Sequence, residues 1–365
     1  MRKPIKALGV APKASLLWLN HNSAPILDIV LKSLESLFII DYPNYEVVII
    51  DNGSDDGSMQ VIEDFIGKAK SQMYLPPMKL VKNNWNLGYT GGNYIGYRHR
   101  AKDSKYVIVV NNDLVVEPHS LKSLICYLEN HASAAAVQGK ITSWDGSKID
   151  NCGFYLDSMY RVHARYNGLP PTEGTKEAVV SYVSGCYSAY RVDAIEEFGG
   201  LFSYILPYFG YFDDADTGLR LWKKGYSVRF VPVLAGQHKG GPSYSHPLKN
   251  YLDMRNRLAS IFNMGGTRRF MVIPWIVYIL SRIPPYLGLS VLRDGEYKTR
   301  AKYAVLALVN SLSLARRTPK IEGDTQEPCI KLRFPSLVKM TFLPSRVAAT
   351  VSLLVNAKGT YNIRV

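Results

Sequence analysis

The sequence predicts an α/β fold built on a mostly parallel sheet with flanking helices, and three features of its first 115 residues support this. Short, continuous apolar stretches recur, and segments with helical periodicity lie between them. A polar loop follows each apolar stretch. Strands that lack polar alternation are typical of a sheet covered by helices on both faces, which is the usual setting of parallel sheets.

The predicted strands and helices of this part alternate regularly. The strands are expected at residues 14–19, 45–50, 78–82 and 105–110. The helices are expected at residues 24–38, 58–68 and, with weaker periodicity, about 90–102. This alternation indicates successive βαβ units, and therefore a parallel sheet.

Polar loops follow the four strands at residues 20–23, 51–58, 83–93 and 111–113. In an open α/β sheet the carboxyl ends of the strands line one crevice, where ligands bind. Asp113 is the best candidate metal ligand at this edge. Mg²⁺ and Mn²⁺ take oxygen ligands and are commonly shared between one or two carboxylates and a diphosphate. A turn whose polar side chains only cap backbone groups is the alternative.

A less regular region runs from about 134 to 245 and carries a cluster of acids. A short helix is predicted to begin near Asp214 and to end at Gly225, with Asp213 and Asp216 also near its start. Crowded carboxylates raise one another's pKa, and a carboxylate within reach of a hydroxyl proton acts as a general base. Capping of the helix and compensation of its dipole are the alternative.

Other patterns narrow the class of protein. The four cysteines lack C-x-x-C spacing, which argues against a zinc site or a disulfide framework and fits a reducing compartment. No dinucleotide-binding or P-loop glycine motif is present. The apolar run near the basic N-terminus is too short for a signal peptide. His238 follows a predicted strand in a glycine-rich loop, where a single histidine is most often structural.

Taken in order, these segments resemble the family 2 glycosyltransferases, which are inverting enzymes of the GT-A fold. The resemblance covers about residues 14–245 and is carried by "VVIIDNGSDDGS", "NWNLGYTGGNYIG", "YVIVVNNDLVVEP", "VSGCYSAYRVDAIEEFGGL", "YFGYFDDADTGLRLWKKGY" and "QHKGG". It points to the branch of rhamnosyltransferases and galactofuranosyltransferase-like enzymes. It implies transfer of a hexosyl or deoxyhexosyl group from a UDP- or dTDP-sugar to an acceptor hydroxyl, in the synthesis of a cell-surface glycan, glycolipid or glycoprotein.

The resemblance also implies roles for residues that would bind the donor. Asp51 would contact the nucleotide base or ribose, with Asn20 and Asn22 nearby. The other positions expected at the nucleotide sugar are Asn86, Gly88, Gly91, Gly92, Asn93, Asn111 and Asn112.

The chemistry is implied in the same way. "NND" stands where the family has its Asp-X-Asp motif, so Asp113 would be the metal ligand and Asn111 replaces the first acid. "FDDAD" stands where the family often has Glu-Asp-X-Asp, so Asp214 matches the catalytic base, with the shorter Asp213 beside it. His238 matches a frequent additional metal ligand, and the implied cofactor is Mg²⁺ or Mn²⁺. Loss of the first acid removes one charge, which weakens cation binding or changes the metal preferred.

The domain organisation is expected to follow the same division. A GT-A domain would occupy residues 1–260, with a nucleotide-sugar-binding half at 14–115 and an acceptor and catalytic half at 134–245. A basic, helical, membrane-associating region would occupy 261–365. That region holds 16 Lys and Arg against 5 Asp and Glu, so it carries most of the net charge of +14.

The apolar stretch 270–292 decides how the C-terminal region is expected to meet a membrane. It contains Arg282 and three prolines, so two shorter helices lying in the membrane interface are expected. A spanning helix and a buried helical hairpin are the alternatives. The charges interleave with apolar runs, which favours an anionic lipid surface over nucleic acid. We expect a peripheral protein on the cytoplasmic face of the cell membrane, acting on a glycan or lipid-linked acceptor.

Two other functions remain open on the sequence alone. A nucleotidyltransferase also has a nucleotide-binding sheet and a metal, but it would carry a basic, glycine-rich signature near the first strand, where this chain has "NHNSAP". The non-enzymatic alternative is a carbohydrate- or membrane-binding module with a decayed active site. It would be favoured if Asp113 and Asp214 could be replaced without loss of the protein's function.

Overall fold

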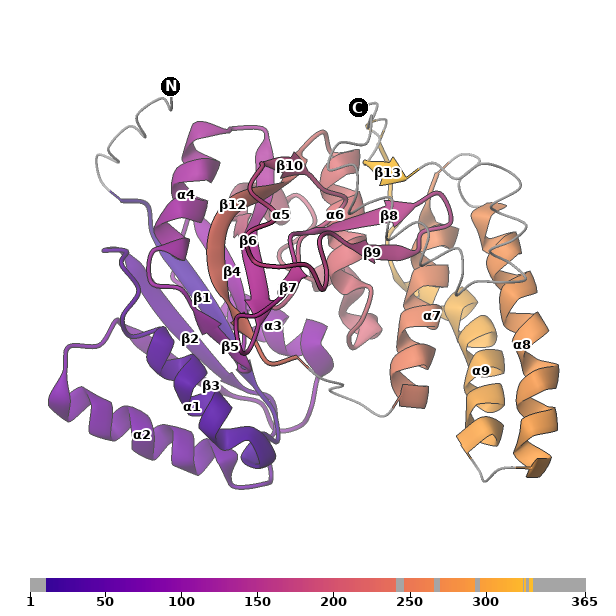
Figure 1. Ribbon diagram of the computed structural model, residues 1–365, viewed down its shortest axis with the longest axis horizontal. Coiled ribbons are helices and arrows are strands. Elements are labelled where there is room, and N and C mark those ends of the chain that lie inside the picture. The colour runs from indigo at the N-terminus through magenta and orange to yellow at the C-terminus, as the bar shows by residue number, and fades with distance from the viewer. Residues whose placement is uncertain are drawn as a thin grey trace.

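The structure is a computed structural model, and it describes residues 11–240, 246–265, 270–292, 296–323, 325 and 328–330. Residues 241–245 of the predicted catalytic half and 331–365 of the predicted C-terminal region lie outside the described residues. A large twisted sheet with helices on its faces forms one part of the molecule, and long C-terminal helices stand beside it (Figure 1).

The first half of the chain builds the parallel part of the sheet. Its strands are β1 (Ala14–Asn20), β2 (Tyr45–Asp51), β3 (Met78–Lys82) and β4 (Tyr106–Asn111). They run parallel to one another in the order β4–β1–β2–β3. The intervening helices are η1 (Ala24–Ile26), α1 (Leu27–Ser36), α2 (Ser58–Gln72) and α3 (Gly88–Arg98). The predicted alternation of strands and helices is confirmed.

The second half extends the sheet with mixed directions. β11 (Tyr187–Arg191) lies antiparallel between β4 and β6 (Ala134–Ser143), and β12 (Ser227–His238) pairs parallel with β6. The short strands on these are β5 (Leu114–Val116), β7 (Ile149–Asn151) and β10 (Ala178–Val179). A separate small sheet contains β8 (Phe154–Asp157), β9 (Val162–Ala164) and β13 (Cys329–Ile330). The helices of this half are α4 (Ser120–Asn130), α5 (Val192–Glu196), η2 (Ser203–Tyr208) and α6 (Asp213–Lys223).

β1 shows why both faces of the sheet are covered. Leu16 and Trp18 belong to one apolar cluster, together with residues of α1 and α4. Leu17 belongs to a second cluster, together with Tyr97 of α3 and Trp222 of α6. Because successive side chains of a strand point to opposite faces, an uninterrupted apolar strand needs helices on both sides.

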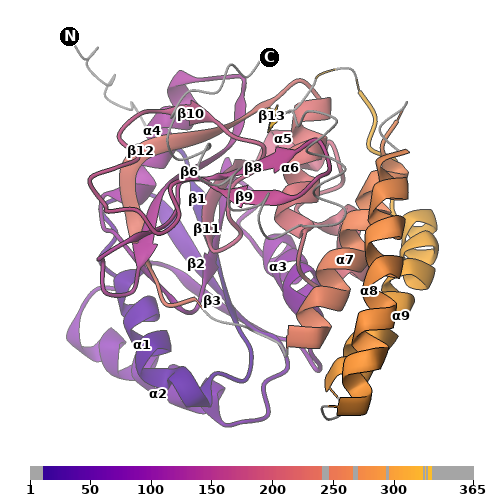
Figure 2. The ribbon, with the colours of Figure 1, turned by 45° about the vertical axis from the view of Figure 1, so that its right-hand side comes forward.

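The C-terminal helices are α7 (His246–Asn263), α8 (Val272–Leu292) and α9 (Glu296–Arg317). They lie side by side (Figure 2). A third apolar cluster joins them to the rest of the molecule, because Trp275 of α8 and Ala304 of α9 pack in one group with Leu156 of β8 and Leu219 of α6. The predicted division of the chain at residue 260 falls inside α7 and stays a prediction.

The apolar stretch 270–292 differs from the prediction. Two shorter helices were expected to be separated at the prolines, and this is wrong, because α8 is one helix that continues through Pro284 and Pro285. The φ angle of proline is itself helical, so proline removes backbone hydrogen bonds without having to end a helix, and α8 packs along α9. Among the described residues, no helix is both long enough and apolar enough to cross a membrane.

Candidate active site

The carboxyl ends of β1, β2 and β4 meet at one edge of the sheet, as predicted. Asn20 is fully buried there, and its Oδ1 accepts hydrogen bonds from Asn112 Nδ2 (2.9 Å) and from Ser23 Oγ (2.6 Å). Asn22 exchanges two hydrogen bonds with Asp55, of 2.8 and 2.9 Å. Asn20, Asn22 and Asn112 therefore hold the loops of this edge in place.

Asn52, which the sequence did not single out, fixes the next loop. It follows Asp51, whose Oδ1 accepts the Ser54 N–H at 3.2 Å. The buried Asn52 side chain donates from Nδ2 to Asn86 Oδ1 (3.1 Å) and to the Gly88 carbonyl (3.0 Å). Only its place directly after Asp51 in "DNGSDDGS" could have indicated this role.

The glycines at the start of α3 are required by packing within the protein. Gly88 has a φ of +72°, and a Cβ there would lie 2.2 Å from the Phe209 carbonyl oxygen. A Cβ at Gly92 would lie 2.6 Å from Cδ1 of Leu19 in β1. Because glycine has no side chain, α3 packs closely against β1 at Gly92 and against Phe209 at Gly88.

The two remaining α3 positions of the prediction, Gly91 and Asn93, also lie within this packed segment. A Cβ at Gly91 would lie 2.7 Å from Cβ of Leu87. Asn93 is 1% exposed, and its Nδ2 donates to the Tyr89 carbonyl at 3.0 Å. Its Oδ1 is buried and accepts no hydrogen bond from any described residue.

β5 and β12 bring the two predicted metal ligands together. Leu114 pairs with His238 in this antiparallel ladder, so Asp113 lies beside His238. His238 Nε2 is 3.2 Å from Asp113 Oδ1, and both side chains are more than four-fifths buried. Burial raises the pKa of Asp113, but the hydrogen bond and charge of His238 outweigh it and hold that pKa below its usual range. Burial lowers the pKa of His238, while Cys186 and the carboxylates of Asp113 and Asp150 raise it well above its ordinary value.

The Asp113–His238 pair fits a divalent cation. Neighbouring ligands of an octahedral Mg²⁺ lie about 3 Å apart when each is about 2.1 Å from the ion, which agrees with the observed 3.2 Å. Across the described part of the chain, no three His, Cys, Asp or Glu side chains are grouped to hold a metal. A cation on this pair would complete its coordination with water and a diphosphate, as Mg²⁺ commonly does.

The predicted base, Asp214, lies near the start of α6. Its Oδ1 accepts the N–H of Ala215 (2.8 Å), and its Oδ2 accepts the N–H of Gly185 (3.4 Å). Burial raises the pKa of Asp214 to about 6, although these two hydrogen bonds act in the opposite direction. Burial, and then the charge of Asp214, raise the pKa of Asp213 well above its ordinary value. A carboxylate such as Asp214 is ionised at neutral pH and binds a proton better than an ordinary aspartate, which suits a general base.

Asp216, the third acid of the cluster, has a structural position. It is fully buried, and its Oδ1 accepts a hydrogen bond from Arg220 Nε at 2.6 Å. Its Oδ2 accepts hydrogen bonds from Tyr208 and from Ser260 of α7. Asp216 therefore joins α6 to α7, and within the trio only Asp214 keeps a partly exposed side chain.

The loop before α6 is strained. Phe209, Tyr211 and Phe212 have φ angles of +67°, +67° and +62°, and such conformations cost about 1–3 kcal/mol each. Asn256 of α7 is fully buried against this loop. Its Nδ2 lies 3.1, 2.8 and 2.7 Å from the carbonyl oxygens of Tyr208, Gly210 and Tyr211. Asn256 thus supports the backbone that places Asp214, and no sequence motif indicated it.

One chain of contacts links Asp214 to the Asp113–His238 pair. The N–H of Gly185 donates to Asp214, and Tyr89 donates its hydroxyl hydrogen to the Gly185 carbonyl. The next residue, Cys186, accepts the Asn111 N–H at 2.9 Å, two residues before Asp113. The two predicted chemical groups therefore border the same end of the sheet.

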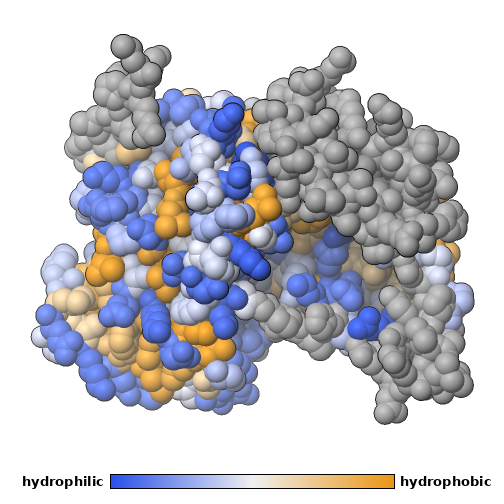
Figure 3. All heavy atoms as spheres, in the orientation of Figure 1, coloured by the Kyte–Doolittle hydropathy of each residue, from blue (hydrophilic) through white to orange (hydrophobic). Residues whose placement is uncertain are grey.

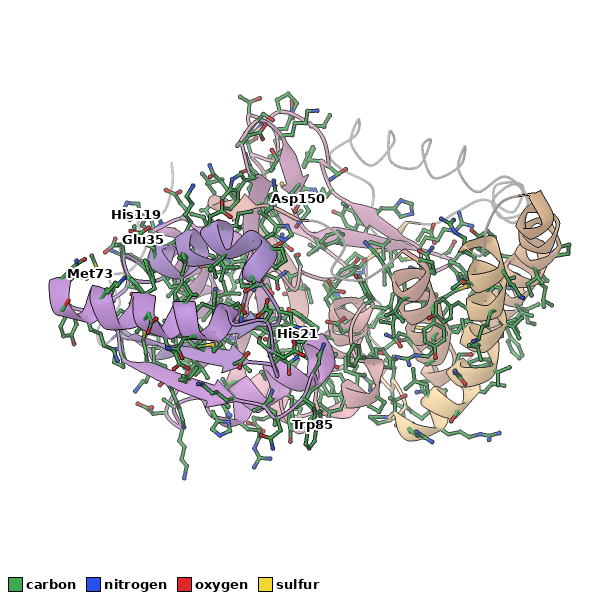
Figure 4. All side chains as sticks on the ribbon, turned by 90° about the horizontal axis from the view of Figure 1, so that it is seen from below. His21, Glu35, Met73, Trp85, His119 and Asp150 are labelled. Atoms are coloured by element: carbon green, nitrogen blue, oxygen red, sulfur yellow. The ribbon has the colours of Figure 1, made fainter. Side chains whose placement is uncertain are left out.

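Part of this edge is exposed to solvent. Figure 4 looks at the molecule from this side, and labels His21 and Trp85, which come from two of the loops, and Asp150. Trp85 is 66% exposed. Figure 3, which faces another side of the molecule, shows hydrophilic residues between the sheet and the C-terminal helices.

A family model for glycosyl transferase family 2 matches residues 15–199, which is half of the chain. The chain belongs to glycosyl transferase family 2. Its relatives include an N-acetylglucosaminyl-diphospho-decaprenol L-rhamnosyltransferase of Mycobacterium tuberculosis, which is 27% identical over 255 residues, covering 63% of this chain and 78% of the relative.

Two solved structures share the fold of this chain, and one of them is a mannosyltransferase. Residues 1–349 of Staphylococcus aureus TarS, in complex with UDP, match with a TM-score of 0.53 and 14% identity over 96% of this chain and 93% of that one. A mannosyltransferase of Pyrobaculum calidifontis, in complex with GDP-Man and Mn²⁺, matches with a TM-score of 0.50 and 14% identity over 85% and 91%.

These findings confirm the predicted family, the GT-A fold and the enzyme class. This family 2 glycosyltransferase transfers sugar from a nucleotide sugar in glycan synthesis. The nucleotidyltransferase and the non-catalytic module are thereby set aside. The roles of individual site residues stay predictions, which the geometry above makes specific.

Proposed function

We propose that this enzyme transfers a hexosyl or deoxyhexosyl group, with inversion, from a UDP- or dTDP-sugar to the hydroxyl of a lipid-linked glycan acceptor. Asp214 would be the general base, and Asp113 and His238 would hold Mg²⁺ or Mn²⁺. One observation carries this proposal. The carboxylate whose pKa is raised to about 6 borders the same sheet edge as a carboxylate–imidazole pair spaced for a cation.

The geometry supports a single displacement. Asp214 accepts the proton of the acceptor hydroxyl while the hydroxyl oxygen forms a bond to the anomeric carbon. The bond from that carbon to the diphosphate breaks on the opposite face, and its electron pair leaves with the diphosphate oxygen, so the configuration is inverted. A cation held by Asp113 and His238 would supply positive charge that stabilises the departing diphosphate. The backbone N–H groups of Gly185 and Ala215 hold the Asp214 carboxylate in place during this transfer.

The comparisons support the donor and the cation. TarS was solved with UDP, and the P. calidifontis mannosyltransferase with GDP-Man and Mn²⁺. The name of the M. tuberculosis relative describes transfer of L-rhamnose to a lipid-linked diphosphate sugar, which supports a lipid-linked acceptor here.

Asparagine variants of Asp213 and Asp214 test the base. We expect Asp214→Asn to bind UDP with unchanged affinity by calorimetry, and to lower turnover about 10²–10⁴-fold, the usual contribution of a general base. Asp213→Asn is the neighbouring control, with the same change of side chain. A larger loss of turnover in Asp213→Asn than in Asp214→Asn would show that Asp214 is not the base.

The acceptor proposal also rests on an exposed face of α9. Val305, Val309 and Leu312 are 43%, 61% and 48% exposed and are spaced four and three residues apart, so they lie on one side of the helix. The same spacing continues to Lys302 and Arg316, both exposed. An apolar centre between cationic ends matches an anionic membrane surface, where each cation adds about 1 kcal/mol.

α8 carries a similar apolar face and lies beside α9. Ile273, Val277 and Leu280 are 55%, 43% and 50% exposed, at the same helical spacing. We therefore propose that α8 and α9 bring the enzyme to the cytoplasmic face of the membrane, where a lipid-linked acceptor would lie.

Flotation of the full-length protein with vesicles tests this docking. A protein truncated near residue 261 is unsuitable, because Trp275 and Ala304 form part of a buried cluster. We expect binding to anionic vesicles and not to neutral ones. Val309→Glu should weaken that binding at least tenfold, since it loses an apolar anchor worth about 1.5–3 kcal/mol. Val61→Glu, at a 40% exposed valine of α2, should not. Equal effects of the two variants, or indifference to lipid charge, would contradict the proposal.

A further inference from the structure

His238 contacts a carboxylate at each of its ring nitrogens. Nε2 faces Asp113, and Nδ1 lies 2.9 Å from Oδ2 of Asp150. Asp150 belongs to β7, and both β7 and β12 pair with the end of β6 near Thr142 and Ser143. Asp150 and His238 thus meet because both of their strands pair with β6. The printed sequence around Asp150, "SKIDNCG", carries no motif that indicates this contact.

The two carboxylates cannot act on His238 in the same way. Nδ1 and Nε2 lie on different sides of the imidazole ring, so a cation shared by Asp113 and Nε2 is out of reach of the carboxylate at Nδ1. A histidine that binds a metal through Nε2 must carry its proton on Nδ1, and a carboxylate that accepts this N–H fixes both the tautomer and the ring orientation.

We propose that Asp150 is a positioning residue for the metal site. It accepts the Nδ1–H of His238 and so directs the Nε2 lone pair toward the cation held beside Asp113. This inference rests on the proposed function, because it takes Asp113 and His238 as the metal ligands. It adds a residue to that site for which neither the sequence nor the family resemblance gave a role.

The local structure allows this carboxylate to be replaced without loss of the fold. The Asp150 side chain is 35% exposed. Its strand is held independently, because the Asp150 carbonyl accepts Asn167 Nδ2 at 2.7 Å and the neighbouring Asn151 Oδ1 accepts Gln138 Nε2 at 2.7 Å. Asp145, in the turn before β7, offers a control with the same charge, since its carboxylate bonds to Ser143 and Ser147 instead.

The test is binding of Mn²⁺ to the full-length protein, alone and with UDP, followed by the electron paramagnetic resonance signal of free Mn²⁺. We expect Asp150→Ala to weaken Mn²⁺ binding about 10–100-fold, as loss of such outer partners of a ligand does. Asp150→Asn should weaken it less, because the amide oxygen still accepts a hydrogen bond. Asp145→Asn should leave it unchanged. Electron spin-echo modulation from a directly bound imidazole nitrogen should be present in the wild type and reduced in Asp150→Ala.

The outcomes separate this inference from the proposed function. If the wild type shows neither Mn²⁺ binding nor imidazole modulation, the metal assignment is wrong and the inference fails with it. If the wild type binds Mn²⁺ and Asp150→Ala binds it equally well, only the role of Asp150 is overturned. Weaker binding with full imidazole modulation would also overturn positioning, since His238 would then reach the cation without Asp150.

Discussion

Replacement of Asn256 by leucine should cause a large loss of turnover and only a moderate loss of stability. Asn256 is fully buried in α7, and its Nδ2 is shared among three carbonyl oxygens of the loop that precedes Asp213 and Asp214. Leucine has the same branched shape and the same number of side-chain heavy atoms as asparagine but no donor, so Asn256→Leu removes these hydrogen bonds without opening a cavity.

The magnitude follows from the hydrogen bonds that are lost. Loss of the two Nδ2–H groups leaves two buried carbonyl oxygens without partners, which lowers the free energy of unfolding by about 1–3 kcal/mol for each. The strained φ angles of the loop, at about 1–3 kcal/mol each, offer a way to recover part of this energy, because the loop can relax into ordinary conformations. We therefore expect a loss of unfolding free energy below about 4 kcal/mol. A shift of about 1 Å in the catalytic group lowers turnover by about 10²-fold.

The assay is a pair of measurements on two variants. Unfolding in urea gives stability, and initial rates give kcat together with the donor KM. Asn263→Leu is the matched control, since Asn263 is also fully buried in α7 but donates to Thr318 and not to the loop. We expect similar losses of stability in both variants and a large loss of kcat only in Asn256→Leu, with the donor KM little changed. Equal kcat in the two variants at temperatures where both are folded would refute the role given to Asn256.

Three further predictions follow from the same site. Because only the ionised form of Asp214 accepts a proton and its pKa is about 6, kcat/KM should fall about tenfold per pH unit below pH 6, and a flat profile over pH 4.5–7 would contradict the assignment. The same raised pKa means that ionisation of Asp214 opposes folding, so Asp214→Asn should raise the Tm at pH 8 and have little effect near pH 4, as thermal unfolding at the two pH values will show. Gly88→Ala should destabilise the protein by about 2 kcal/mol or more, because φ is +72° and the added Cβ meets the Phe209 carbonyl, whereas Gly67→Ala in α2, where nothing lies within 4 Å of the added Cβ, should be neutral or stabilising in the same urea titration.

Several parts of the fold and of the site could be predicted from the sequence, because they depend on local pattern. Apolar runs with no polar alternation gave β1 to β4 within a residue or two, and the polar segments after them gave the ligand edge with Asp51 and Asp113 on it. A parallel sheet needs little more than this pattern, since the carboxyl ends of its strands share one edge. The place of Asp214 in the first turn of α6 was predicted in the same way.

Only the tertiary structure decided which side chains meet. The antiparallel pairing of β5 with β12 puts His238 beside Asp113, and β6 brings Asp150 to its other nitrogen. The folded chain also separated Asp216, which is bound to Arg220, from Asp214, which stays partly exposed with a raised pKa. It kept α8 helical through its prolines by packing it along α9. Each of these outcomes depends on strand register and burial between residues far apart in the chain, and local sequence contains neither quantity.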